Sequence, residues 1–229
     1  MKFGVVQFPG SNGDQDAYNA VCDVLKQPVE YIWHKSTAVD GFDCIIIPGG
    51  ASYGDYLRPG AVASLSPVID AIRGYADQGG RVIGIGNGFQ ILCEAGLLPG
   101  ALMTNSNVRF KCSYISVRVE NNFSDFSHKC TVGQTLSLPI EDYQGSYYCN
   151  ADELKPLESE NSILLRYCDK SGKVTYDANP NGSALNIAGI LNEAGNVAGM
   201  MPHPERAVDD ILGSADGVLI LKSIAQRLD

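Results

Sequence analysis

Three short apolar runs, each ending at a glycine-rich turn, constrain the fold of this chain more than any other feature. They are residues 3–8, followed by Pro9-Gly10, residues 44–47, followed by Pro48-Gly49-Gly50, and residues 81–85, followed by Gly86-Asn87-Gly88. Runs that are short and apolar throughout are typical of strands buried on both faces of a parallel sheet. Residues 14–25 and 61–78 lie between these runs and have the apolar spacing of helices. Buried strands that alternate with helices predict an α/β fold, with a mostly parallel sheet and helices on both of its faces.

The second half of the chain is richer in strands. Residues 114–119, 135–140, 163–167, 187–191 and 197–201 are strand-like, and a last helix is expected over about residues 216–227. The sequence has no internal repeat and no low-complexity linker. We therefore expect a single domain, residues 1–229, with a β-rich second half.

The charge and the cysteine content limit the classes of partner and compartment. Acidic residues outnumber basic ones by 26 to 17, so the net charge is −9 and no basic surface is available to displace counterions from nucleic acid. No uncharged apolar stretch approaches the ~18 residues that a membrane helix needs, and the N-terminal apolar run is too short for a secretion signal. The seven cysteines are an odd number and fit a reducing compartment. These features predict a cytoplasmic protein that has neither nucleic acid nor membrane as its partner.

The glycine-rich turns are the first candidate ligand site, because ligands of an open parallel sheet bind at the carboxyl ends of its strands. One such turn is more often only a sharp reversal of the backbone, but three in one half of the chain favour an anion or oxyanion site built from backbone N–H groups. A dinucleotide fingerprint would need a small residue at Phe89 and an acid near residues 105–110, and the chain has neither. The alternative is a nucleophile elbow, whose reactive position would be Gly86, a residue without a side chain.

His203 is the strongest candidate for acid–base chemistry. It lies between two prolines, and residues two apart in an extended chain point the same way, so Glu205 can orient its imidazole. A lone histidine is more often structural, and we assign His34 and His128 to structural or surface roles. No His, Cys, Asp or Glu residues have metal-ligand spacing, so no metal site is predicted.

Taken together, the motifs resemble those of class I glutamine amidotransferases, and most closely those of the glutaminase subunits of phosphoribosylformylglycinamidine synthases in purine biosynthesis. The similarity extends over nearly the whole chain. It rests on residues 8–12 (FPGSN), 48–50 (PGG), 52–58 (SYGDYLR), 87–92 (NGFQIL), 96–100 (GLLPG), 119–122 (VENN), 199–207 (GMMPHPERA) and 213–217 (GSADG). The resemblance implies the flavodoxin-like fold of class I amidotransferases.

The resemblance also implies a reaction and a set of site residues. In that family a cysteine thiolate at the elbow attacks the side-chain amide of glutamine, a histidine moves the protons, and ammonia leaves before water hydrolyses the thioester. The family pattern assigns Gly49, Gly50 and Asn87 to the oxyanion loops, Gln90 to a contact with glutamine, and His203 and Glu205 to the catalytic pair. It implies no cofactor in this chain. ATP and Mg²⁺ belong to a separate synthetase subunit, which uses the ammonia to amidate formylglycinamide ribonucleotide, and a small accessory subunit is compatible with such a complex.

The chain departs from the family pattern at the nucleophile. Gly86 occupies that position, and neither Cys93, two helical turns further on, nor Cys44, inside a strand, obviously replaces it. Loss of a covalent nucleophile is expected to lower kcat by a factor on the order of 10⁶. Relatives also usually carry a second cysteine where this chain has Gly13, and Ala-His-Gly-x-Gly where it has residues 141–145 (EDYQG).

Three explanations of Gly86 are compatible with the sequence. The nucleophile was replaced deliberately, or a modified cysteine was written as another residue, or the chain is a natural relative that has lost glutaminase activity. Gly13 and the segment from Asp142 to Gln144 favour natural loss, because a replacement made to trap glutamine would leave those positions alone.

Three functional hypotheses follow. The first is a glutaminase (amidotransferase) subunit of a synthase complex, which would supply ammonia from glutamine but is inactive while position 86 is glycine. The second is a naturally degenerate, non-catalytic binding or scaffold subunit of the same synthetase or of a paralogue, working from free ammonia. The third and remoter one is different chemistry in the emptied pocket, with His203 and Glu205 as an acid–base pair and Asp142 added.

Overall fold

Residues 1–226, which the computed structural model describes, form a nine-stranded sheet and a separate two-stranded one. The order of the large sheet is β2-β1-β3-β4-β11-β10-β9-β6-β7. Its first five strands are parallel to one another: β2 (Val29–Trp33), β1 (Phe3–Gln7), β3 (Cys44–Ile47), β4 (Arg81–Ile85) and β11 (Val197–Met200). The other four continue the sheet with antiparallel pairing: β10 (Ile187–Leu191), β9 (Ile163–Cys168), β6 (Lys111–Val119) and β7 (Thr135–Asp142). The α/β prediction is confirmed, and the β-rich second half belongs to the same sheet as the parallel first half.

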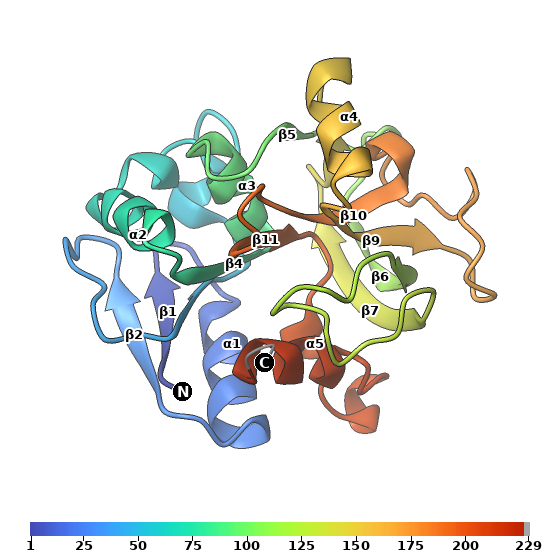
Figure 1. The fold of residues 1–229 in the computed structure, drawn as a ribbon. Helices are drawn as coiled ribbons and strands as arrows, with labels where there is room; N and C mark the ends of the chain where they lie inside the picture. Colours follow the sequence, from blue (N-terminus) through green and yellow to red (C-terminus); the bar gives the residue numbers. More distant parts are fainter. Residues whose placement is uncertain (227–229) are drawn as a thin grey trace.

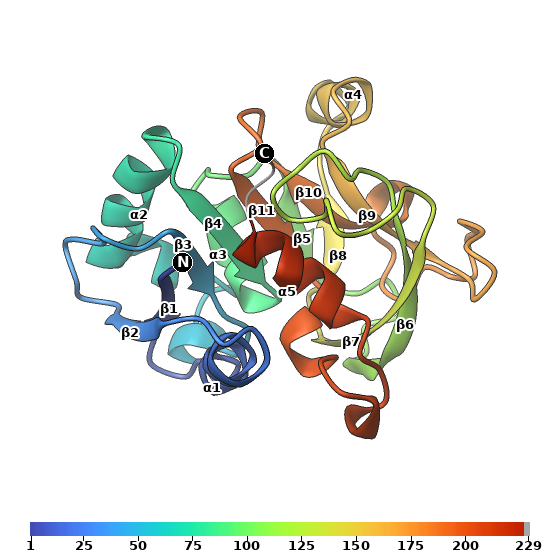
Figure 2. The ribbon, with the colours of Figure 1, turned by 60° about the horizontal axis from the view of Figure 1, so that its bottom comes forward.

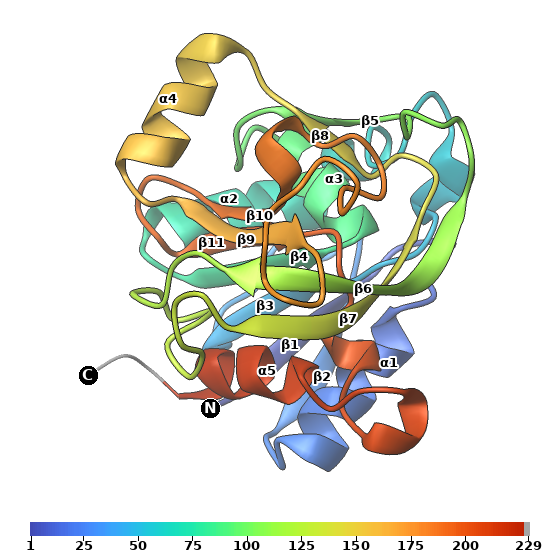
Figure 3. The same cartoon turned by 90° about the vertical axis from the view of Figure 1, so that its right-hand side faces the viewer.

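Helices cover both faces of the large sheet (Figure 1). The helices α1 (Asp14–Asn19) and α5 (Gly217–Ala225) lie on one face, as Figure 2 shows from below. The opposite face carries α2 (Pro67–Asp77), α3 (Asn87–Glu94), α4 (Ala151–Ser159) and the two-stranded sheet of β5 (Ala101–Met103) and β8 (Ser146–Tyr148) (Figure 3). Among the described residues, no helix has both the length and the apolar character needed to cross a membrane.

Every residue of the strand β3 is apolar because the strand is buried on both faces. Cys44 and Ile46 pack into the core beneath α1 and α5, whereas Ile45 and Ile47 pack into the core beneath α2 and α3. All four side chains are at most 1% exposed. A strand covered on both faces buries every side chain, and the alternation between polar and apolar residues that marks a half-exposed strand disappears.

The helices differ in detail from those expected. The helix expected over residues 14–25 is α1 followed by a π-helical segment, Ala20–Val24. The helix expected over residues 61–78 is a short 3₁₀ turn, Ala63–Leu65, followed by α2. Pro67 begins α2 because its fixed φ and missing N–H suit the first position of a helix. The last helix, expected over about residues 216–227, ends at Ala225, and residue 227 lies outside the described residues.

The helix α4 is absent from the sequence-based expectation, although its start carries a recognisable signal. Asn150 Oδ1 accepts hydrogen bonds from the backbone N–H groups of Asp152 (2.9 Å) and Glu153 (3.0 Å). The Glu153 carboxylate in turn accepts from the N–H of Asn150 (3.1 Å), which completes a capping box. Pro156 lies inside the helix and masks this signal, because proline normally argues against a helix interior.

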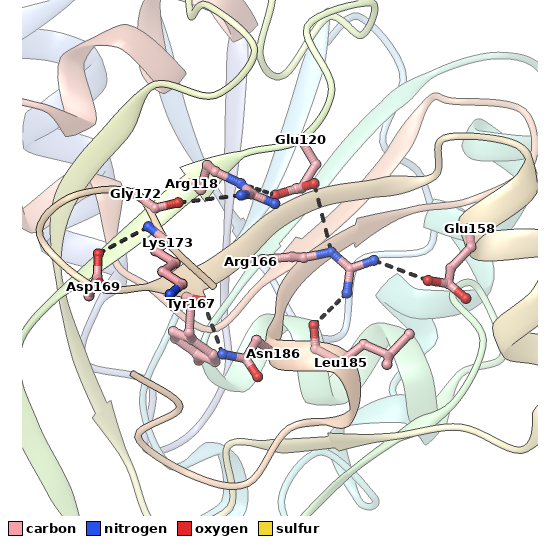
Figure 4. A network of polar contacts seen from close by, with 10 residues as sticks. All are labelled: Arg118, Glu120, Glu158, Arg166, Tyr167, Asp169, Gly172, Lys173, Leu185 and Asn186. Atoms are coloured by element: carbon pink, nitrogen blue, oxygen red, sulfur yellow. Dashed lines mark hydrogen bonds and ion pairs between the residues drawn. The ribbon is translucent and has the colours of Figure 1, made fainter. Parts of the chain in front are cut away.

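A network of charged side chains connects the antiparallel strands with α4 (Figure 4). Arg118 on β6 and Arg166 on β9 are directly opposite one another, and like charges so placed destabilise a sheet. Glu120 supplies the countercharge: its carboxylate accepts from Arg118 Nε at 2.6 Å and lies 3.8 Å from Arg166 Nε. Arg166 also pairs with Glu158 of α4 at 3.4 Å. The network therefore joins three elements of the second half of the chain.

Candidate active site

Four neighbouring strands bring the predicted site residues to one edge of the sheet. The strands β1, β3, β4 and β11 are adjacent and parallel, so their carboxyl ends lie together. The first three end at the three glycine-rich turns, and β11 leads into the segment that contains His203. Ligands of open parallel sheets bind at this edge.

Gly86 forms the sharp turn between β4 and α3. Its φ of 53° and ψ of −110° are a combination that L side chains rarely adopt. Its N–H donates to the carbonyl of Met200 on β11 (2.8 Å), and its own carbonyl accepts from the N–H of Phe89 (3.0 Å). The backbone therefore has the geometry of a nucleophile elbow, with no side chain at its apex.

His203 and Glu205 form a buried pair. The Nδ1 atom of His203 donates to Oε1 of Glu205 over 2.6 Å, and both residues are 3% exposed. The two side chains meet although Pro204–Arg206 form a 3₁₀ turn rather than the extended chain from which the contact was expected. Since a carboxylate only accepts, Nδ1 carries the ring proton of the neutral imidazole and Nε2 is left as an acceptor.

The imidazole of His203 lies directly against the apex of the elbow. A Cβ atom on Gly86 would lie 2.9 Å from both Cε1 and Nε2 of His203, and 3.7 Å from Cα of Gly49. A Cβ atom on Gly49 would lie 2.5 Å from Cε1 of His203, so position 49 has no room for a side chain. The Nε2 acceptor therefore faces the place that a side chain of residue 86 would occupy.

At Gly13 and Gly50 the backbones of the turns after β1 and β3 lie too close together for a side chain to fit easily. The N–H of Gly13 donates to the carbonyl of Gly49 (3.1 Å), and a Cβ atom on Gly13 would lie 3.1 Å from the nitrogen of Gly49. Gly50 has φ of 134°, and a Cβ atom there would lie 2.7 Å from the nitrogen of Asn12. The N–H of Asn87, at the first position of α3, has no intrahelical acceptor. The residues assigned to the oxyanion loops are thus grouped around Gly86.

Three hydrogen bonds in series hold the loops around the elbow. The N–H of Ser52 donates to Oδ1 of Asn87 (3.1 Å), and Nδ2 of Asn87 donates to Oε1 of Gln90 (2.8 Å). Gln90 Nε2 then donates to the carbonyl of Gln144 (2.8 Å). The side chain of Gln90, assigned to a glutamine contact, therefore also fixes the segment that departs from the family pattern.

A cavity of about 270 Å³ opens beside these residues. It is lined by the glycine-rich turns that follow β1 and β3, by Asp55 and residues 57–59, by the start of α3, by the end of β7, and by His203. None of the seven cysteines, all of which are free and lie within the described residues, lines this cavity. Cys93 is 9% exposed, and burial raises the pKa of its thiol well above the ordinary value, which disfavours the thiolate. The described lining residues include neither a thiol nor an aliphatic hydroxyl.

Asp142 is a site residue that sequence reasoning included only in the third hypothesis. It ends β7 on the buried side, in step with Leu138 and Ile140, and is 4% exposed. Neither of its carboxylate oxygens has a hydrogen-bond partner among the described residues. Burial raises the pKa of Asp142 to about 6, and the neighbouring Asn105 and His203 limit this rise. The only signal in the sequence was the unusual segment of residues 141–145.

Arg206 links the turn that carries His203 to α1 and to β7. Its Nε donates to Asp16 of α1 over 2.9 Å, and its Nη1 forms a close ion pair with Glu141 of β7. These contacts hold the turn that carries His203. No three His, Cys, Asp or Glu residues of the described chain are placed to hold a metal ion.

Comparisons with known proteins match almost the full length of this chain to glutamine amidotransferases. A family model described as a CobB/CobQ-like glutamine amidotransferase domain matches residues 1–216. The phosphoribosylformylglycinamidine synthase subunit PurQ of Moorella thermoacetica is 53% identical over 224 residues, which cover 98% of this chain and 95% of the relative. The subunit PurQ of Salinibacter ruber is 52% identical over 227 residues, covering 99% of this chain and 97% of the relative.

Solved structures are similar as well. The match to a structure of PurLQS from Thermotoga maritima has a TM-score of 0.86 and 41% identity, and covers 98% of this chain and 97% of the matched one. The glutaminase domain of Trypanosoma brucei CTPS with bound acivicin matches with a TM-score of 0.58 over 100% of this chain and 95% of that one. At 12% identity, that likeness shows a shared fold alone.

Proposed function

Because the chain belongs to the glutamine amidotransferase family that includes the PurQ subunits of phosphoribosylformylglycinamidine synthase, we propose that it is the PurQ-type subunit of such a synthase and that Gly86 makes it inactive as a glutaminase. The similarity supports the first part, since it extends over 98% of the chain at 53% identity. We treat residues 1–229 as one amidotransferase-like domain that works in the cytoplasm. Its partner is a synthetase subunit, which would bind the ATP and Mg²⁺.

The absence of a side chain at the elbow carries the second part of the proposal. The family reaction needs a thiolate to attack the amide carbon of glutamine, and the Nε2 atom of His203 faces the place from which it would take the thiol proton. With Gly86 there is no atom to form the thioester, and among the described residues no thiol lines the cavity to replace it. Attack by water alone leaves a rate lower by a factor on the order of 10⁶.

Glutamine hydrolysis by three forms of the full chain tests this proposal. The Gly86→Cys variant, assayed with the synthetase partner, should gain glutamate release over the parent chain. The matched control is Gly86→Ala, which adds the same Cβ atom beside His203 but no nucleophile, and it should remain inactive. Substantial hydrolysis by the parent chain, or no gain in a folded Gly86→Cys variant, would contradict the proposed role of position 86.

A second candidate function is a non-catalytic subunit that supports a synthetase using free ammonia. The observation that favours it is an intact framework around an inactive elbow. The loop of residues 52–55 is tied to α3 through Asn87, and the turn that carries His203 is held by Arg206. A framework retained without the nucleophile is suited to assembly rather than to glutamine chemistry.

This second function is tested with the synthetase in the presence of nucleotide, Mg²⁺ and ammonium chloride. We expect the chain to co-purify with the synthetase and to raise the rate of its ammonia-dependent amidation. A matched sample without the chain sets the baseline. Failure to associate, together with an unchanged amidation rate, would exclude the scaffold role. It would not affect the conclusion drawn from glutamine hydrolysis by the parent chain and the Gly86 variants.

A further inference from the structure

Residues 53–57, in the loop between β3 and α2, have an unusual backbone. Tyr53, Asp55 and Leu57 have φ values of 53°, 54° and 68°, in the left-handed region that L side chains rarely adopt. Asp55 and Leu57 line the cavity beside Gly86, so the loop forms part of the cavity wall. Backbone in this region is strained and persists only where the surrounding structure holds it in place. The loop therefore depends on contacts that fix its conformation.

The side chain of Tyr53 supplies such a contact. Its hydroxyl shares a hydrogen bond of 2.7 Å with Nδ1 of His34 and one of 3.1 Å with Oγ of Ser66. The rings of Tyr53 and His34 also meet edge-on, with centroids 5.6 Å apart. Among residues 53–57, all of which the structure describes, Tyr53 is the one whose side chain forms a hydrogen bond. It is therefore the point at which this segment is attached to the rest of the fold.

His34 is itself fixed on both sides of its backbone. It follows β2 directly, and its N–H donates to the carbonyl of Gln7 on β1 (3.0 Å), while its carbonyl accepts from the N–H of Val68 in α2 (3.2 Å). The residue is 6% exposed, and its ring packs edge-on against Trp33 at 4.4 Å. Burial and the nearby charge of Lys35 lower the pKa of His34, so its imidazole is neutral at pH 7.5. The ring is thus an immobile and uncharged partner for a hydroxyl group.

We propose that His34 is a positioning residue of the candidate active site. It is not one of the described residues that line the cavity, and it acts through Tyr53, which holds residues 53–57 in their left-handed conformation. The effect extends to the start of α3, because the N–H of Ser52 at the beginning of the loop donates to Oδ1 of Asn87 (3.1 Å). Loss of the hydrogen bond between His34 and Tyr53 loosens the cavity wall without removing any residue that lines the cavity.

The sequence alone favoured a structural or surface role for His34, and its burial and its contact with Tyr53 give that role a specific purpose. The inference rests on the proposed function only in treating the cavity as an active site. The loop can be observed without glutamine hydrolysis and without a synthetase partner. A failure of this inference is therefore distinguishable from a failure of the proposed function.

Amide hydrogen exchange in the full chain, followed residue by residue with nuclear magnetic resonance at pH 7.5, tests the proposal. Tyr53→Phe removes the hydroxyl and keeps the ring. We expect the amides of Ser52 and Gly54 to exchange roughly three- to tenfold faster in this variant, as the loss of one neutral hydrogen bond does to a local opening equilibrium. The backbone amide signal of Asn87 should shift as well. The matched control, Tyr56→Phe, removes a hydroxyl from an exposed side chain of the same loop and should change neither.

Two substitutions of His34 separate hydrogen bonding from packing. His34→Asn places an amide, which can donate or accept, close to the position of Nδ1, whereas His34→Leu fills space without a polar atom. We expect His34→Leu to behave like Tyr53→Phe, and His34→Asn to remain closer to the parent chain. A loop that is as well protected in His34→Leu as in His34→Asn would contradict a role for the hydrogen bond.

The exchange of α4, which lies outside the loop, shows whether an effect is local. An unchanged loop in Tyr53→Phe, or an acceleration of the same size in the amides of α4, would overturn the proposal. Tyr53→Phe removes a single oxygen atom, so it decides the question by itself if the His34 variants do not fold.

Discussion

Asp142→Asn is expected to stabilise the folded chain at neutral pH, because it removes a buried charge whose desolvation outweighs the compensation from its neighbours. Burial raises the pKa of this carboxyl from 3.8 to about 6, against the opposing influence of Asn105, His203 and Lys111. One pKa unit corresponds to about 1.4 kcal/mol of differential interaction between the two protonation states. Ionised Asp142 therefore lowers the free energy of unfolding by about 3 kcal/mol at pH 7, and the variant should recover most of it.

The sign of the pH dependence follows from the direction of the shift. Between the two pKa values the folded state binds more protons than the unfolded one, so the stability of the parent chain falls as the pH rises from about 4 to about 6. Above that window the loss is complete. Near pH 4 and below, Asp142 is protonated in the folded state, so the advantage of the variant's amide over the neutral carboxyl should shrink toward zero.

Urea unfolding measures this difference. The parent chain, Asp142→Asn and the exposed-site control Asp40→Asn are compared at pH 4 and pH 7.5, and the free energy of unfolding is obtained by linear extrapolation. We expect a gain only for Asp142→Asn and only at pH 7.5. A variant that is no more stable than the parent at pH 7.5, or equally stabilised at both pH values, would refute the reasoning.

Two further predictions concern the elbow and α4. Gly86→Cys should lower the free energy of unfolding by about 1–3 kcal/mol, because its φ of 53° strains an L residue and its Cβ atom would lie 2.9 Å from the ring of His203. Calorimetry should show a drop in Tm of roughly 2–4 °C per kcal/mol, also for Gly86→Ala, and an unchanged Tm in both variants would mean that the elbow is not strained. Asn150→Ala should cost about 1 kcal/mol by removing the acceptor of the capping box, measured by the same scan. A Tm equal to that of the parent would show that this cap contributes nothing.

Much of the architecture could be predicted from local patterns. The apolar runs of residues 44–47 and 81–85 indicate buried strands, since a strand covered on both faces has no polar side to alternate with. The glycines that follow them indicate turns at the carboxyl ends of parallel strands, and the structure brings those turns together. Such features depend on a few consecutive residues, which is why the sequence reveals them.

Other features depend on contacts that no local pattern contains. Pro156 argues against a helix, yet the capping box at Asn150 and the burial of Leu157 stabilise α4. The strand expected over residues 135–140 runs two residues further, because Glu141 pairs with Cys112 and Asp142 with Lys111 of β6. The same register turns the Asp142 side chain toward the buried side, where no sequence pattern would place a carboxylate.

The sequence by itself determined that position 86 carries no nucleophile. The identity of a side chain is local information, and glycine has no side-chain atom to attack an amide. Only the tertiary structure decided what surrounds that position. Pairing of β4 with β11 brings His203 against the elbow, and the course of β7 brings Asp142 to the same cavity. These residues are 117 and 56 positions from Gly86 in the sequence, so strand pairing rather than spacing places them there.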